Sequence, residues 1–321
     1  MRDPFRSLVS RRAASCALLG WVAAFVFAGV GAAQGAPVLT LVIGSDPDGS
    51  QVFAEDLTSL WAERNSPTPE RLAWTVVPAP RERLRSLGRG RGEFALLAAD
   101  DAARLLPEFP RVKALAVLWP VYLHALTRND AVQAVRLPPA APVLALENAG
   151  YAFDGFWEWS PDGGASRDKL EIYPSGWMAD VLSQLRQGVF LFSAPAPLQE
   201  IVDELQRDPG LRLVPFEPAL LEEFRVNYPW LRMIVLPQGS YPRMRGNMEL
   251  PARMMVMVGS LELAEGSVRK LLDTVYGARD AAARIDPLFR QIRAEANASF
   301  SPLLPYHPAA AAALGLAQKQ P

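Results

Sequence analysis

The chain has 321 residues, of which 50% are hydrophobic and 21% charged, and its formal net charge is -1. These values are close to the averages of globular proteins, so they exclude a disordered chain and a membrane protein with many spans. The balanced charge argues against a nucleic-acid partner, because phosphate binding needs a surplus of Lys and Arg. The only cysteine is Cys16, near the N-terminus, so the rest of the chain has no disulfide, no thiolate nucleophile and no cysteine-based metal site.

Residues 1–36 have the organisation of a signal peptide. A basic start with several arginines is followed by an apolar stretch over residues 16–33, and the small residues around Ala33 to Ala36 suit a signal peptidase. The alternative is an uncleaved membrane anchor, because the apolar stretch approaches the length that spans a bilayer. Cleavage between Ala33 and Ala36 is the prediction, and the remaining chain is expected to be exported.

Strand-like apolar runs alternate with amphipathic helical stretches from residue 38 onward, which is the pattern of parallel βαβ units. The opening unit is a buried strand over residues 38–43, a turn over 44–50 and a helix over 51–64 with apolar side chains at helical spacing. The next strands are expected at residues 72–77, 93–98 and 112–126, the last interrupted by Pro120, and the next helices at 80–87 and 100–106.

A change of composition at residues 128–142 predicts a crossing between two lobes, since this segment is polar and then rich in proline. Residues 254–258 form a β-prone run that is expected to return the chain to the first lobe. One lobe is therefore predicted from residues 38–127 with 245–321, and the other from residues 128–244. The strands of the second lobe are expected at residues 143–146, 170–173, 189–193, 211–215 and 232–236, and the remaining helices at 176–186, 198–206, 220–226, 263–276 and 285–296.

The turn before the first helix is the best candidate for a binding loop. Main-chain N–H groups from Ser50 and Gln51 at the helix start, with the hydroxyl groups of Ser45 and Ser50, could hold an anionic group. Asp46 and Asp48 bring negative charge into the same loop, and an ordinary turn with a helix N-cap would explain these residues without any ligand. Both interpretations of the loop are consistent with its local sequence.

The aromatic residues and the histidines give little indication of a catalytic or metal site. The aromatic residues between 151 and 159 would suit either a cleft or the core of a lobe. His124 and His307 are too few for a metal site or a Ser-His-acid triad, and neither GxSxG nor HExxH is present, so core or surface positions are expected. No catalytic residue, metal or cofactor is predicted, and the protein is not expected to be an enzyme. The aromatic residues are Tyr151, Phe153, Phe156, Trp157 and Trp159.

Landmarks along most of the chain match a known family in their order. A pattern of leucine, glycine, acid, apolar run and aspartate occurs as Leu87, Gly88, Glu93, residues 94–99 and Asp100. The other landmarks are Leu41 to Ser45 with Gly49, Leu211 to Pro215, Asn227 to Pro229, Leu236 to Pro242, the β run ending at Val258, and His307 with Pro308. Through these residues the chain resembles the TAXI group of TRAP-transporter solute-binding subunits, the periplasmic receptors that deliver substrates to sodium-driven membrane transporters.

The resemblance implies an α/β, two-lobed type-II periplasmic-binding-protein fold, which closes on a ligand between its lobes by a hinge movement. It also implies a periplasmic location, a small anionic organic solute or an amino acid as ligand, and a TRAP membrane permease as partner. By likeness of position, ligand contacts are expected at Ser45, Ser50, Gln51, Asp100, Tyr122 and Tyr241.

The chain departs from the family in two loops. After the first strand of the second lobe, the family has a Gly-Ser-Gly-Thr turn that helps to grip the ligand carboxylate, and this chain has Glu147 to Tyr151. The loop around Asp46 and Asp48 lacks the family's threonine and paired tyrosines. The alternative is therefore a degenerate receptor that acts as an envelope sensor or interaction subunit without a transported ligand. A hydrolytic enzyme is a third hypothesis, which a Ser or Asp with a perturbed pKa beside a basic group in the cleft would favour.

Overall fold

The computed structural model describes most of the chain beyond residue 37. The predicted signal peptide and the aromatic residues between 151 and 159 lie outside the described residues. Within the described part, no helix is both long enough and apolar enough to cross a membrane. The described residues are 38–45, 48–66, 70–89, 93–136, 139, 141–147, 149, 170–277 and 286–316.

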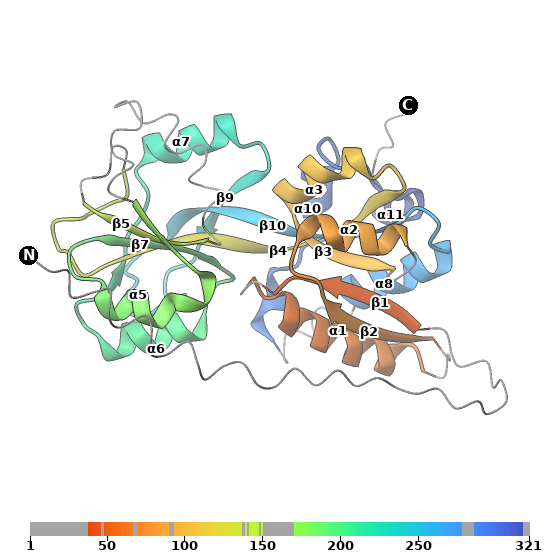
Figure 1. Ribbon diagram of the computed structural model, residues 1–321, viewed down its shortest axis with the longest axis horizontal. Helices are drawn as coiled ribbons and strands as arrows, with labels where there is room; N and C mark the ends of the chain where they lie inside the picture. Colours follow the sequence, from red (N-terminus) through yellow and green to blue (C-terminus); the bar gives the residue numbers. More distant parts are fainter. Residues whose placement is uncertain are drawn as a thin grey trace, which may run out of the picture. The chain divides into compact units, whose positions relative to one another are not determined.

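The described strands join in one 10-stranded mixed sheet (Figure 1). Along its main path the strand order is β2-β1-β3-β10-β4-β7-β5-β6, while β8 pairs with β4 and β9 pairs with β10. The strands are β1 (Val38–Ile43), β2 (Arg71–Val76), β3 (Phe94–Ala98), β4 (Val112–Thr127), β5 (Val143–Leu146), β6 (Leu170–Tyr173), β7 (Val189–Ala194), β8 (Arg212–Leu213), β9 (Leu231–Leu236) and β10 (Met248–Ser260).

The first three strands are parallel, because each is followed by a helix that returns the chain to the same end of the sheet. β1 pairs with β2 and with β3, both in parallel. Helix α1 (Ser50–Arg64) connects β1 to β2, helix α2 (Pro80–Gly88) connects β2 to β3, and helix α3 (Ala99–Leu105) begins directly after β3. This part of the chain confirms the predicted βαβ pattern.

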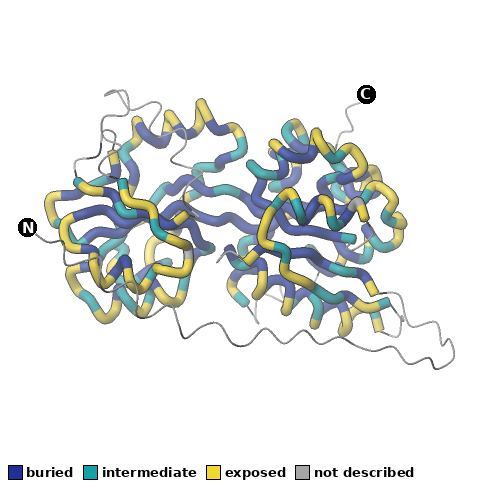
Figure 2. The backbone as a smooth tube through the Cα atoms, in the orientation of Figure 1, coloured by how far each residue is buried: buried dark blue, intermediate teal, exposed yellow. Residues whose placement is uncertain are grey.

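Two long strands, β4 and β10, run antiparallel to each other through the middle of the sheet. The first half of β10 pairs with β9 and its second half with β3, while the second half of β4 pairs with β7. Figure 2 shows both strands buried along most of their length. Through these strands the β1–β3 part of the sheet is continuous with the β5–β7 part.

Two predictions about these strands are wrong. The expected interruption at Pro120 does not occur, since β4 continues through it. The register between β4 and β10 shifts between Met254 and Val256, next to Pro120, and such an irregularity tolerates a residue that lacks an N–H group. The strand expected at residues 254–258 begins earlier, at Met248, because its first half pairs with β9.

Three clusters of buried side chains form the core. Met255 and Met257 of β10 belong to one cluster, and their neighbours Val256 and Val258 to another. Because successive side chains of a strand point to opposite faces, these two clusters lie on the two faces of the same part of the sheet. The third cluster contains residues of β5, of β7, such as Phe190, and of the helices near them.

The helices of the second half have other bounds than the sequence indicates. The helix expected at residues 285–296 is replaced by a 3-10 turn and a separate short helix, α10. The chain is extended at Ile292, so Phe289 and Ile292 both enter the core, and Phe289 stacks on Phe53 with ring centroids 5.3 Å apart. The helices and 3-10 turns not yet given are η2 (Leu106–Glu108), η5 (Ser175–Trp177), α5 (Met178–Gln184), α6 (Gln199–Arg207), α7 (Pro218–Asn227), α8 (Glu265–Gly277), η6 (Pro287–Gln291), α10 (Ala296–Phe300) and α11 (Pro308–Ala313).

The strand order β2-β1-β3-β10-β4 places a late strand, antiparallel, between β3 and β4. This insertion of a returning strand is the arrangement of a type-II periplasmic-binding-protein lobe. The predicted α/β fold class is therefore confirmed.

Candidate functional site

The carboxyl ends of β1 and β3 are neighbours, since the two strands are parallel and pair directly at Leu41 with Phe94 and at Val42 with Ala95. The turn leading to α1 begins at the end of β1, and α3 begins at the end of β3. In open α/β sheets, ligands bind at these strand ends. The topology therefore brings two of the predicted ligand contacts, Ser50 and Asp100, to one edge of the sheet.

The first turn of α1 already holds a carboxylate from its own loop. The main-chain N–H of Ser50 donates to Oδ1 of Asp48 at 2.9 Å, and Trp119 Nε1 donates to the main-chain oxygen of Asp48 at 2.7 Å. Gly49 between them has φ 87°, a conformation that favours glycine. Ser50 is fully buried, and its Oγ has no hydrogen-bond partner. The predicted anion-binding N–H of Ser50 is thus paired with Asp48, and the hydroxyl of Ser50 is left unsatisfied.

The other two predicted contacts of this loop are exposed. Ser45 lies on the surface, and Gln51 donates from Nε2 to Oε1 of Glu55 at 2.9 Å, one turn along α1. Both side chains are therefore accessible to a solute from the solvent side.

Asp100 and Arg253 form a loose, largely buried ion pair. Asp100 lies in the first turn of α3, and Arg253 lies on β10, opposite Val121 of β4. The distance from Arg253 Nη1 to Asp100 Oδ2 is 3.7 Å, and the two side chains are 12% and 15% exposed. The other carboxylate oxygen of Asp100, Oδ1, has no hydrogen-bond partner. Burial raises the pKa of Asp100, and the positive charge of Arg253 counteracts this only in part.

Three separate segments meet beside Gly49. A Cβ atom at Gly49 would lie 3.1 Å from Cγ of Pro195, which follows β7, and 3.3 Å from a methyl group of Leu288 in η6. Gln291, also in η6, donates from Nε2 to the main-chain oxygen of Ala196 at 2.9 Å, and its Oε1 is buried without a partner. The loop after β7 is thereby held against the start of α1 and against η6.

Tyr122 and Tyr241 lie in the core around His124. The hydroxyl of Tyr241 accepts from the main-chain N–H of Leu198 at 3.0 Å and lies 3.0 Å from Nε2 of His124, while Nδ1 of His124 lies 3.0 Å from the main-chain oxygen of Tyr122. These contacts are satisfied if Tyr241 donates to Nε2 and the proton of the ring is on Nδ1. Burial lowers the pKa of His124 to about 4, raises that of Tyr122 to about 12 and also raises that of Tyr241.

The sequence analysis missed Arg253, Gln291 and the pairing of Asp48 with the start of α1. A signal for Arg253 was present, because an arginine inside a long apolar strand needs an acidic or polar partner. Gln291 had no such signal, since its position depends on the break between η6 and α10. No group of three or more His, Cys, Asp or Glu side chains that could hold a metal ion occurs among the described residues.

Comparisons with known proteins give one family match and several structural likenesses. The model of the NMT1-like family matches residues 164–314, slightly less than half of the chain. No curated protein matches in sequence.

The structural likenesses include two binding proteins and a sensor domain. The tungstate-binding protein TupA from Desulfovibrio alaskensis is 11% identical, with 76% of this chain and 92% of that chain covered and a TM-score of 0.48. The alkanesulfonate-binding protein SsuA from Xanthomonas axonopodis, bound to MOPS, is 13% identical, with 88% and 85% covered and a TM-score of 0.41. A histidine kinase sensor domain with similarity to periplasmic binding proteins is 13% identical, with 79% and 96% covered and a TM-score of 0.45. At these identities and TM-scores, no ligand or partner is carried over to this chain.

Proposed function

We propose that this chain is an exported, periplasmic solute-binding protein of the TAXI type, which presents a small organic acid or amino acid to a TRAP membrane permease. The strand order of a type-II periplasmic-binding-protein lobe and the match to the NMT1-like family support this proposal. The lobes would be residues 38–127 with 245–321 and residues 128–244, and the solute would bind between them. The single observation that carries the proposal is the buried pair of Asp100 and Arg253 at the carboxyl end of β3.

This pair suits a solute that carries both charges. Asp100 keeps one oxygen without a hydrogen-bond partner, so it can accept from an ammonium group, and Arg253 provides the positive charge for a carboxylate. At 3.7 Å the two side chains are too far apart for a good hydrogen bond between them. An amino acid could donate from its ammonium group to the unpartnered oxygen of Asp100 and place its carboxylate near the positive charge of Arg253. Within the proposed class of solutes, amino acids are therefore preferred to dicarboxylates.

The remaining predicted contacts would have different roles. Ser50 has an unsatisfied hydroxyl at the same edge of the sheet, and Ser45 and Gln51 are accessible beside it. Tyr122 and Tyr241 are buried in the core, so neither would touch the solute, and Tyr241 would act by holding the loop after β7. A solute that contacts both lobes would stabilise their closed arrangement by its preference for it.

Isothermal calorimetry of the purified protein against amino acids, dicarboxylates and keto acids tests the proposal. We expect at least one amino acid to bind, with its affinity reduced at least about tenfold in Asp100→Asn, because a charge-assisted hydrogen bond is lost. Asp273→Asn is the matched control, since Asp273 is an exposed carboxylate on α8. Absence of binding by every solute, or equal affinity in Asp100→Asn and the wild type, would refute this assignment.

A degenerate receptor is the second candidate, and Asp48 favours it. Its carboxylate accepts from the N–H of Ser50, which is where an anionic solute would otherwise bind at the start of α1. A receptor of this kind would show no solute-dependent rise in melting temperature and would co-purify with an envelope partner in the absence of solute.

The raised pKa of Asp100 beside Arg253 also meets the condition set for a hydrolytic enzyme. The same shift is expected of any buried carboxylate, so it does not by itself indicate catalysis. Turnover of an ester or amide substrate that disappears in Asp100→Asn would establish hydrolysis in place of binding.

A further inference from the structure

A groove of about 680 Å³ lies outside the candidate site. It is formed by the loop after β4, by β8 with the turn before it, and by the connection between β9 and β10. None of the six predicted ligand contacts lines it, and neither does Arg253. Its volume is in the range of pockets that hold small organic molecules.

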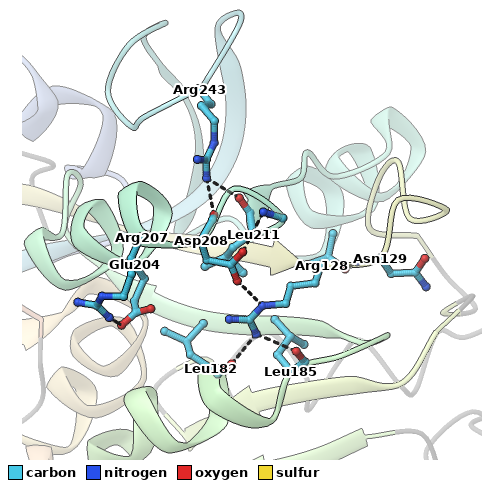
Figure 3. Close-up of polar contacts among 11 residues, drawn as sticks. Arg128, Asn129, Leu182, Leu185, Glu204, Arg207, Asp208, Leu211 and Arg243 are labelled. Carbon is cyan, nitrogen blue, oxygen red and sulfur yellow. Dashed lines mark hydrogen bonds and ion pairs between the residues drawn. The ribbon is translucent and has the colours of Figure 1, made fainter.

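Two arginines of the groove are fixed by main-chain carbonyl groups. Arg243 donates from Nη2 to the main-chain oxygens of Asp208 and Leu211, at 2.7 and 3.0 Å (Figure 3). Arg212 donates from Nη2 to the main-chain oxygens of Asn129 and Val132, at 3.0 and 2.6 Å. Each guanidinium group has five N–H donors, so both arginines keep further donors while their orientation is set.

The groove has an excess of positive charge. The carboxylate of Asp208 pairs with Arg128, with 2.5 Å between Oδ2 and Nε, so Arg243 meets only the main chain of that turn (Figure 3). Arg245 is exposed and has no hydrogen bond or ion pair with the described residues. Among the described residues of the lining, the only acid is Asp130, whose fully exposed side chain is 3.9 Å from Arg212. Three arginines therefore face one weakly placed carboxylate.

The same lining has an apolar part. Leu213, Met244 and Met248 are half-buried, and they pack on the core cluster that contains residues of β5 and β7. Apolar side chains next to oriented guanidinium groups bind molecules with an apolar body and an anionic head. We propose that this groove is a second binding site, for a small amphipathic organic anion with a carboxylate, sulfonate or phosphate group.

Titration with anilinonaphthalene sulfonate, an aromatic sulfonate whose fluorescence rises on binding, tests this site. We expect one saturable site whose affinity falls about three- to tenfold in Arg243→Gln and in Arg245→Gln, because each removes a charged hydrogen-bond donor. The affinity should also fall with added NaCl, as expected of a charge-dependent interaction in an open groove. Arg245→Gln removes no contact within the described residues, so this variant is expected to fold like the wild type.

Two control variants separate this site from other possibilities. Arg269→Gln removes an exposed arginine of α8 whose partner among the described residues is Glu265, so it makes the same change in charge elsewhere. Asp100→Asn alters the candidate solute site. Both should bind the probe as the wild type does. The inference is overturned if Arg269→Gln weakens binding as much as Arg245→Gln does, if neither groove variant weakens it, or if Asp100→Asn abolishes it.

Discussion

Protonation of the buried His124 should control the acid stability of this protein. Burial lowers the pKa of its ring from 6.5 to about 4, and the contact with the main-chain oxygen of Tyr122 opposes this shift only in part. The unfolded chain therefore binds a proton at this residue at a higher pH than the folded protein does. The stabilisation is fully present above pH 6.5 and is lost progressively as the pH falls towards 4.

The magnitude follows from the size of the shift. One pKa unit corresponds to about 1.4 kcal/mol, so His124 should remove about 2 to 3 kcal/mol from the free energy of unfolding between neutral pH and about pH 4.5. The contacts of the His124 ring also indicate that its protonation lowers the free energy of unfolding. A proton on Nε2 would face the hydroxyl of Tyr241, which could then no longer donate to the ring.

Urea unfolding of the wild type and of His124→Gln, at pH 7 and about pH 4.5, measures this effect. Glutamine does not titrate, so the wild type should lose about 2 to 3 kcal/mol more than the variant between the two pH values. His307→Gln is the comparison, because burial lowers the pKa of this other histidine as well, but by less, so its removal should reduce the pH dependence less than His124→Gln does. An equal pH dependence in the wild type and in His124→Gln would refute the argument from burial.

Three further outcomes are expected. Gly49→Ala should lower the free energy of unfolding by about 2 kcal/mol more than Gly239→Ala in denaturant titrations, since both glycines have positive φ but only Gly49 has close neighbours. Arg128→Met should cost about 2 kcal/mol in the same assay, because it removes the ion-pair partner of Asp208 and the donor to the main-chain oxygens of Leu182 and Leu185, and a cost below about 1 kcal/mol would contradict this. Solute affinity should rise with pH as Asp100 ionises, and calorimetry should find this dependence absent in Asp100→Asn.

The strands of the parallel part could be predicted closely from the sequence. The predicted and observed bounds coincide for β1, β5 and β6. Each is a short run of strand-forming residues next to a turn or a proline, and in β1 and β5 most side chains are buried, so local hydrophobicity locates the strand. The α/β class follows from the same alternation of strands and helices.

The errors concern elements whose ends depend on distant partners. Pro120 does not end β4, because a register shift against β10 accommodates it. Residues 248–253 belong to β10 because β9 pairs with them, although this stretch contains Pro251 and an arginine. The helical spacing over residues 285–296 is interrupted because Phe289 and Ile292 pack into the core by way of an extended residue.

The two expected ligand contacts at this edge of the sheet had different sources. Ser50 was expected from the local sequence of its loop and Asp100 from its position in the family resemblance, and the parallel pairing of β1 and β3 brings them to one edge. The partner of Asp100 could not be named in this way, because Arg253 reaches it from a strand more than 150 residues later in the chain. The groove lined by Arg212, Arg243 and Arg245 has no local motif, since Arg212 comes from β8 and the other two from the connection between β9 and β10.

The sequence by itself determined the alternation of strands and helices, the α/β class and the strand ends where a site is expected, because these depend on local hydrophobic patterns and turn residues. Only the tertiary structure decided that Asp48 accepts a hydrogen bond from the N–H of Ser50, that Arg253 lies beside Asp100 and that the buried His124 contacts the hydroxyl of Tyr241. Each of these contacts depends on where a distant strand or loop is placed. Burial shifts the pKa values of Asp100 and His124, and a local sequence pattern does not specify how deeply a side chain is buried.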